Sequence, residues 1–228
     1  MNTNVNLLAP IGGLALVGTG FLLLVAALIL IQSLIVHRKG RAKIVLLAMV
    51  VIAAAYLAAT LIFSLASHEN VLARGEEKHF CEIDCHLPYS IVNTQLSKTL
   101  GNPPNQTTAQ GSYTVVTIKT RFDETTISPP RGNALLYPNR RVLKVIDERG
   151  NQYSPSIEAQ QVLDKTSTGY QRFTTPLRPG ESYLTQIVFD LPADAKVANL
   201  LINEGEWETH LVIGHENSPL HRKTRFQL

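Results

Sequence analysis

The stretch that decides the first part of the fold is HRKGRAK, residues 37–43, which separates two long runs without a charged side chain. The run before it extends from Asn2 to Val36, and the run after it, IVLLAMVVIAAAYLAATLIFSLA, occupies residues 44–66. As a helix the second run is about 34 Å long, against a bilayer hydrocarbon thickness of about 30 Å. We therefore expect a two-helix transmembrane hairpin in residues 1–66, with spans at about 14–36 and 44–66.

The basic link predicts how this hairpin is oriented. Four of the 21 Lys and Arg residues lie in residues 37–43, and all 18 acidic residues lie at or after Glu69. Because basic loops are retained in the cytoplasm, both termini should lie outside. The uncharged N-terminal tail is not typical of a cleavable signal peptide. We predict a multi-pass protein of the bacterial inner (cell) membrane, in contact with membrane lipid, whose C-terminal domain lies in the periplasm or extracellular space.

Composition and motifs exclude several classes of function. Hydrophobic residues make up 45% of the 228 residues and charged residues 17%, which excludes a disordered chain. Outside the link the chain has 17 basic and 18 acidic residues, so its net charge is close to zero and gives no argument for nucleic-acid binding. Neither span carries an ionisable residue that would mark an ion path. Motifs of hydrolases and nucleotide-binding enzymes are absent from the sequence, and we do not expect an enzyme.

The remainder of the chain has the alternating pattern of half-buried strands. In Tyr113–Phe122, Val116 and Ile118 share one face with Phe122, and Ser182–Phe189 alternates in the same way. Turns are expected at Asp147–Asn151 and at Arg178–Glu181. We predict a two-sheet antiparallel β-sandwich in residues 111–214, a juxtamembrane connector in residues 67–110 and a C-terminal tail in residues 215–228, without a long amphipathic helix. Further strands are expected at Ala134–Tyr137, Arg141–Ile146, Ala198–Ile202 and Trp207–Ile213.

Several strings in the same region carry a family resemblance. They are Arg121–Ser128, Leu136–Arg140, Asp147–Tyr153, Leu177–Ser182 and Val188–Pro192. Together they resemble the bacterial telokin-like, immunoglobulin-like domains, often found on lipoproteins or membrane anchors. The resemblance implies an immunoglobulin-like antiparallel β-sandwich and an exported location, and it supplies no catalytic residues.

The main candidate site is the octapeptide HFCEIDCH, residues 79–86, which holds both cysteines of the chain. Thiolate and imidazole ligands packed this closely suit copper or zinc. Cysteines four residues apart lie on one side of a helical turn. We therefore consider a copper site formed by Cys81 and Cys85 with His79 or His86.

Three other interpretations of the same motif stay open. Cysteines in an oxidising compartment commonly pair, so a Cys81–Cys85 disulfide would make the motif structural. The spacing also resembles rarer variants of covalent haem c attachment, with His86 as proximal ligand, although one residue longer than the common Cys-x-x-Cys-His signal. A thiol–disulfide exchange pair is less favoured, because no thioredoxin-like pattern surrounds it.

These observations lead to two hypotheses of function. The first is a non-enzymatic, membrane-anchored accessory protein that binds copper or haem in electron transfer or metal handling, beside another envelope or respiratory membrane protein. The second is a purely structural interaction module with a disulfide. Acidic residues near strand ends, Asp123 and Asp147 among them, are expected to be solvated in either case.

Overall fold

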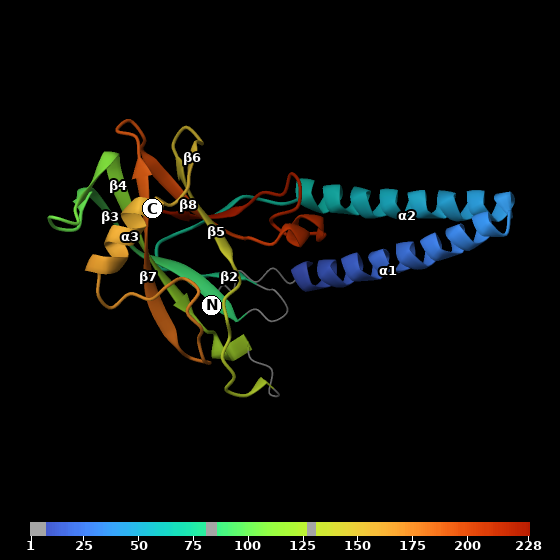
Figure 1. The fold of residues 1–228 in the computed structure, drawn as a ribbon, viewed down its shortest axis with the longest axis horizontal. Helices are drawn as coiled ribbons and strands as arrows, with labels where there is room; N and C mark the ends of the chain where they lie inside the picture. Colours follow the sequence, from blue (N-terminus) through green and yellow to red (C-terminus); the bar gives the residue numbers. More distant parts are fainter. Residues whose placement is uncertain (1–7, 81–85, 127–130) are drawn as a thin grey trace. The chain divides into compact units, whose positions relative to one another are not determined.

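The computed structural model describes residues 8–80, 86–126 and 131–228, and Figure 1 shows it coloured along the sequence. The described chain divides into two compact units. A helical unit contains residues 8–68 together with Trp207–Arg222, and a sheet unit contains Glu69–Glu206 together with Lys223–Leu228.

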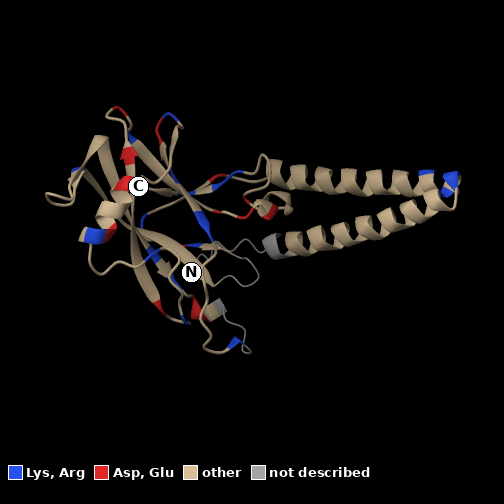
Figure 2. Cartoon of the chain, in the orientation of Figure 1, with Lys and Arg blue, Asp and Glu red and all other residues tan. Residues whose placement is uncertain are grey.

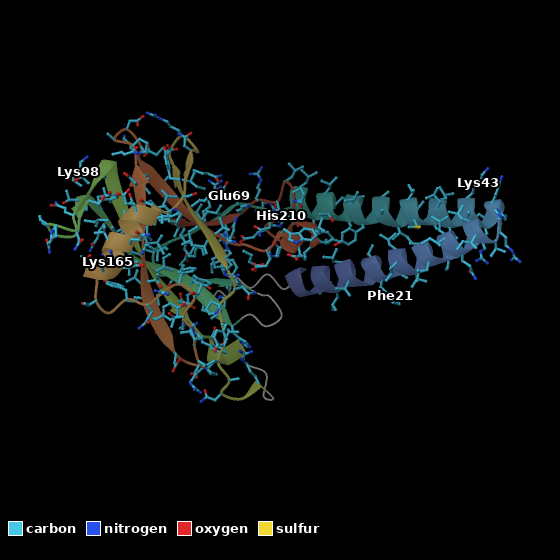
Figure 3. All side chains as sticks on the ribbon, viewed as in Figure 1. Phe21, Lys43, Glu69, Lys98, Lys165 and His210 are labelled. Atoms are coloured by element: carbon cyan, nitrogen blue, oxygen red, sulfur yellow. The ribbon has the colours of Figure 1, made fainter. Side chains whose placement is uncertain are left out.

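The helical unit is built on two long apolar helices, α1 (Leu8–Ile35) and α2 (Lys39–Leu65). Their candidate spans have mean hydropathies of 2.8 and 2.6, so both helices are long and apolar enough to cross a membrane. Their apolar side chains project outward, as the 63% exposed Phe21 does (Figure 3). The expectation of two apolar helices in the first third of the chain is confirmed.

The turn between the helices gathers basic side chains. His37 has a left-handed backbone, with φ of 53°, and Arg41 bonds back to α1, donating from Nε to Ser33 Oγ at 2.8 Å and from Nη2 to Gln32 Oε1 at 2.7 Å. Figure 2 shows Lys and Arg at this end of the helical pair and uncharged residues along the rest of both helices.

The second part of the helical unit, Trp207–Arg222, begins with the 3₁₀ helix η3 (Trp207–Leu211). A strand was expected here, and that expectation was wrong. The segment pairs with no described strand and contacts α2 instead. Leu211 O accepts from Tyr56 Oη of α2 at 2.6 Å, and Arg222 N donates to Ser67 Oγ, just beyond α2, at 2.8 Å.

The sheet unit confirms the predicted fold class of a largely antiparallel two-sheet β-sandwich. Its described residues form a five-stranded sheet, in the order β1-β9-β8-β5-β6, and a four-stranded sheet, in the order β2-β3-β4-β7. The pairs are antiparallel except that β1 runs parallel to β9. The strands are β1 (Asn70–Leu72), β2 (Lys78–Phe80), β3 (Leu87–Leu100), β4 (Thr107–Arg121), β5 (Arg141–Asp147), β6 (Gln152–Tyr153), β7 (Ser182–Leu191), β8 (Val197–Glu204) and β9 (Thr224–Gln227).

Both sheets contribute to one core, and β4 is buried on both faces. Val116 and Ile118 of β4 lie in the core between the sheets, with residues of both. Tyr113 and Val115, on the opposite face, pack against Ala159 and Leu163 of helix α3 (Ile157–Thr166). The strand predicted in Tyr113–Phe122 is therefore confirmed, but it is not half-buried as expected, because α3, which was not expected, covers its second face. The core between the sheets includes Leu72, Phe80, Tyr89, Ile91, Val145, Phe189, Leu191, Leu200, Ile202 and Phe226.

The sandwich begins earlier and ends later than the sequence suggested. Strands β1, β2 and β3 lie in residues 67–110, which were expected to form a connector, and β9 lies in residues 215–228, which were expected to form a tail. Residues Ala134–Tyr137 contribute a single bridge, Leu136 to Leu177, in place of the expected strand. Strand β3 was not predicted because its polar and apolar residues do not alternate regularly. The physical cause is that its register against β4 shifts between Ile91 and Asn93 and again between Ser97 and Thr99.

Both expected turns are present. Gly150 closes the β5–β6 turn with φ of 85°, and Gly180 takes φ of 79° in the turn before β7, where Glu181 N donates to Arg178 O at 3.0 Å. Glycine adopts this left-handed backbone without a steric penalty. A short 3₁₀ helix, η1 (Glu124–Thr126), follows β4.

Candidate functional site

The two histidines of the predicted motif flank the junction of β2 and β3. His79 lies in β2 opposite Pro88 of β3, and His86 directly precedes β3. Both side chains are buried. Cys81 and Cys85, the two thiols of the predicted metal site, lie outside the described residues.

The end of β4 brings a third element to these histidines. Asp123 Oδ2 lies 3.2 Å from His79 Nε2, and Asp123 N donates to His86 O at 2.8 Å. The ring of Phe122 lies 5.1 Å from that of His86, centroid to centroid. Residues 122 and 123 therefore contact both histidines of the motif.

A chain of charged groups continues from Asp123 toward the surface. Arg121 donates from Nε and Nη2 to the two carboxylate oxygens of Glu77, at 2.8 and 2.7 Å, and from Nη2 to Asp123 Oδ2 at 3.2 Å. Thr125 completes the shell of Asp123, donating from N at 3.0 Å and from Oγ1 at 2.7 Å to Oδ1. Such a fork between Arg and carboxylate fixes both charge and geometry.

The electrostatics of this chain favour the ionised carboxylates. Burial alone raises the pKa of Asp123, but the hydrogen bonds from Thr125 and Arg121 outweigh it, and the pKa lies well below its usual range. The hydrogen bond from Arg121 likewise lowers the pKa of Glu77, and the bond to Glu77 raises the pKa of Arg121. Asp123 is thus an anion at neutral pH and can only accept a proton in a hydrogen bond.

This arrangement determines which nitrogen of His79 carries a proton. Facing an ionised carboxylate, Nε2 must donate, so in the neutral ring the lone pair lies on Nδ1. Nδ1 is buried and has no hydrogen-bond partner among the described residues. A carboxylate that holds one ring nitrogen while the other is available to a ligand is the usual arrangement around metal-binding histidines.

Of the predicted site, the structure describes the two histidines and not the two cysteines. His79 and His86 both contact Asp123 at the end of β4, but within residues 8–80, 86–126 and 131–228 no three His, Cys, Asp or Glu residues form a group that could hold a metal ion. Sequence reasoning missed Asp123, Arg121 and Glu77. Asp123 was expected to be solvated, and that expectation was wrong, because its side chain is only 6% exposed and accepts hydrogen bonds from Thr125 and Arg121.

An open cavity of about 500 Å³ lies elsewhere in the sheet unit, between α3, the segment that follows it and β7. Its lining includes Gln160, Asp164, Tyr170, Phe173 and Gln186. Neither His79 nor His86 of the predicted motif is among its described lining residues.

Comparison with known proteins gives a few distant likenesses in fold. No protein-family model matches the chain, and no curated protein matches it in sequence, so the telokin-like resemblance stays a prediction. A conserved hypothetical protein from Bacillus anthracis is similar at 14% identity over 58% of this chain and 89% of its own, with a TM-score of 0.43. The secreted protein MPT63 of Mycobacterium tuberculosis is similar at 11% identity over 72% of this chain and 100% of its own, with a TM-score of 0.44. The yjhA protein from Bacillus subtilis is similar at 12% identity over 69% of this chain and 98% of its own, with a TM-score of 0.39.

Proposed function

We propose that this chain is a membrane-anchored accessory protein that holds a β-sandwich on the extracytoplasmic side of a bacterial cell membrane. The observation that carries the proposal is the apolar helical pair, whose side chains stay exposed along α1 and α2. Helices of this length in the core of a soluble protein would be buried. In a bilayer the same side chains contact lipid and need no protein partner.

The charge distribution supports the orientation. The four basic residues of the link gather at the turn between α1 and α2, and basic turns stay in the cytoplasm. A multi-pass chain with this turn inside carries everything after Leu65, the sheet unit included, to the outer side. The role proposed for the sandwich there is binding, not catalysis.

Single cysteines at two exposed lysines test this orientation. In a Cys81→Ser/Cys85→Ser background, Lys43→Cys lies beside the turn and Lys165→Cys lies in α3 of the sheet unit; Figure 3 labels both positions. In intact spheroplasts an impermeant maleimide should label Lys165→Cys, and Lys43→Cys should react only after permeabilisation. Labelling of Lys43→Cys alone from outside, or release of the protein by alkaline carbonate, would refute the proposal.

A second function is favoured by the environment of His79. We propose that the motif His79, Cys81, Cys85 and His86 binds copper, for metal handling or electron transfer with another envelope or respiratory membrane protein. Asp123 holds Nε2 of His79, and the buried Nδ1 has no hydrogen-bond partner among the described residues. Soft thiolates and imidazole are ligands that Cu(I) prefers. Covalent haem c with His86 as ligand is the less favoured form of the same proposal.

Metal analysis of the purified protein under reducing conditions separates this proposal from the structural alternative. Copper should bind the unmodified protein, and Cys81→Ser/Cys85→Ser should abolish binding. Asp123→Asn, which leaves the proposed ligands in place, should weaken affinity about 10- to 100-fold. His210→Gln, an exposed histidine of the helical unit, is the matched control and should bind normally. A protein with neither metal nor haem and a quantitatively formed Cys81–Cys85 disulfide would establish the structural interaction module instead.

A further inference from the structure

Residues Trp207–Arg222, here called the cap segment, lie at the end of the helical pair opposite the basic turn. Figure 3 shows His210 of this segment at one end of the pair and Lys43 at the other. Tyr56 of α2 donates to Leu211 O, and Ser67 Oγ accepts from Arg222 N. The cap segment also packs on α1 so closely that a Cβ at Gly12 would overlap Ile213 O and lie 2.9 Å from Val212 Cγ1.

Several backbone N–H and C=O groups of the cap segment form hydrogen bonds within the segment itself. Successive turns are closed by His215 N to Val212 O at 3.2 Å, Ser218 N to His215 O at 2.9 Å and His221 N to Ser218 O at 3.1 Å. Asn217 adds a bond from Nδ2 to Thr209 Oγ1 at 2.9 Å. Because unsatisfied backbone groups are what excludes irregular chain from lipid, internal hydrogen bonds lower the cost of entering a region with little water.

Large apolar side chains nevertheless project from this segment. Trp207 is 67% exposed, Leu220 is 70% exposed, and Leu211 is exposed as well. They stand on the end of a helical pair that is itself covered with exposed apolar groups. Tryptophan, with an apolar ring and a polar N–H, is enriched where lipid chains meet headgroups.

The length of the hairpin fixes the depth of the cap segment. The 27 residues of α2 span about 40 Å, which matches a bilayer of about 40–45 Å with its headgroups. If the basic turn lies in one headgroup layer, the opposite end lies in the other. We propose that the cap segment is an interfacial element in the outer headgroup layer, with Trp207, Leu211 and Leu220 directed toward the lipid chains. This inference rests on the proposed membrane anchoring.

Trp207 is the only tryptophan of the chain, so its own fluorescence tests the inference. Two acidic residues, Glu208 and Glu216, outnumber Arg222, so the cap segment has no net positive charge that would draw it to anionic lipid. The full chain is therefore reconstituted in phosphatidylcholine vesicles. Lipids brominated at shallow, middle and deep positions of the acyl chain then report depth. We expect blue-shifted emission that is lost most strongly with the shallow bromines and is protected from aqueous iodide.

A matched control moves the single tryptophan to the sandwich. Tyr137 is 67% exposed, like Trp207, and the double variant Trp207→Phe/Tyr137→Trp should be quenched by iodide and be insensitive to brominated lipid. A triple variant, Trp207→Phe/Tyr137→Phe/Leu220→Trp, places the single tryptophan at position 220 of the cap segment. Its quenching by iodide and by brominated lipid should match that of the unmodified protein.

The outcomes separate this inference from the anchoring proposal. Protein released from the vesicles by carbonate would refute the anchoring. Protein that resists carbonate, with Trp207 open to iodide and unaffected by bromines, would refute the interfacial position alone. Protection from both quenchers would overturn it as well, because it would show that protein and not lipid covers Trp207.

Discussion

Asp147 holds the turn between β5 and β6 as an acceptor of four hydrogen bonds. Oδ1 accepts from Arg149 N at 2.9 Å and Asn151 N at 2.8 Å, and Oδ2 accepts from Asn151 Nδ2 at 2.9 Å and Tyr153 Oη at 3.1 Å. Burial raises the pKa of Asp147, but the hydrogen bonds from Asn151, Tyr153 and Arg149 lower it more, so the net shift is downward.

This lowered pKa predicts how stability depends on pH. Unfolded Asp titrates near about 3.9, and a lower folded pKa means that the unfolded chain binds more protons in acid. The contribution of Asp147 is therefore complete above about pH 5 and is lost as the pH falls below about 4. Thermal unfolding in mild detergent should show Asp147→Asn less stable at pH 7, with the difference from the unmodified protein narrowing in acid. The exposed neighbour Glu148→Gln should not reproduce this, and an equal loss in both variants would contradict the prediction.

Gly111 of β4 crosses the chain that leaves β7. A Cβ there would overlap backbone atoms of Leu191, Pro192 and Ala193, none of which can rotate away as a side chain can. We expect Gly111→Ala to lower the free energy of unfolding by about 1–3 kcal/mol through overpacking. Gly205→Ala, whose Cβ would lie 3.1 Å from Arg140 O, should cost less in the same urea titration. Equal stability of Gly111→Ala and the unmodified protein would show that this crossing can relax.

At the scale of the element, α3 shields the edge of the four-stranded sheet. Gln160 imitates a neighbouring strand: its Oε1 accepts from Val188 N at 3.0 Å, and its Nε2 donates to Gln186 O at 2.9 Å. Ser156 N adds a bond to Val188 O at 2.9 Å. An edge strand covered in this way is protected from pairing with other chains.

Removing the amide of Gln160 should expose that edge. Gln160→Ala leaves Val188 N without its acceptor, and we expect a loss of about 1–3 kcal/mol in unfolding free energy. Hydrogen exchange at the Val188 amide should accelerate in this variant. Gln161→Ala makes the same change on the exposed side of α3 and should leave both quantities unaltered. Unchanged exchange at Val188 in Gln160→Ala would contradict the edge-capping role.

Strand β9 is short, but it contributes a central side chain. Phe226 is fully buried and lies between Leu200 of β8 and Leu72 of β1 in the paired register. We expect Phe226→Ala to lower the unfolding free energy by about 3–5 kcal/mol, whereas the exposed neighbour Gln227→Ala should have little effect. Chemical denaturation of both variants checks this, and similar losses would mean that β9 matters through its backbone alone.

The elements that the sequence predicted are those whose pattern is local. Val116 and Ile118 in β4, and Tyr183 and Phe189 in β7, lie on the faces that the sequence pattern predicted, and all four are buried. Strand β3 was not predicted because its bulges shift the side chains from one face of the sheet to the other partway along the strand. Strands β1 and β9 are too short to show a period, and their pairing joins distant parts of the chain.

The candidate site was predictable to a similar degree. The spacing of His79 and His86 marks them in the sequence because the motif is compact. Asp123 lies far along the chain, and only the register of β3 against β4, in which Tyr89 pairs with Thr120, carries the end of β4 to the histidines. A run of acidic residues at a strand end gives no sign of which carboxylate will turn inward.

For the whole molecule, sequence and structure agree that the chain has two parts with opposite placement of apolar side chains. The helical pair exposes apolar groups, and the sheet unit buries them in a core between two sheets. The domain boundaries were less predictable, since the chain enters the sheet unit, leaves it for Trp207–Arg222 and returns for β9. Such a return leaves no local mark on composition.

Because β1 pairs with β9, the sheet cannot be completed until the end of the chain has been synthesised. Leu72 and Phe226 are joined in one sheet although about 150 residues separate them along the chain. During synthesis, a chain that has not yet placed residues 224–227 beside Leu72 lacks the Phe226 side chain of the core, and closing so long a loop is slow. The sandwich therefore remains incomplete until the last strand has been synthesised, and until then its open core is accessible to proteases and chaperones.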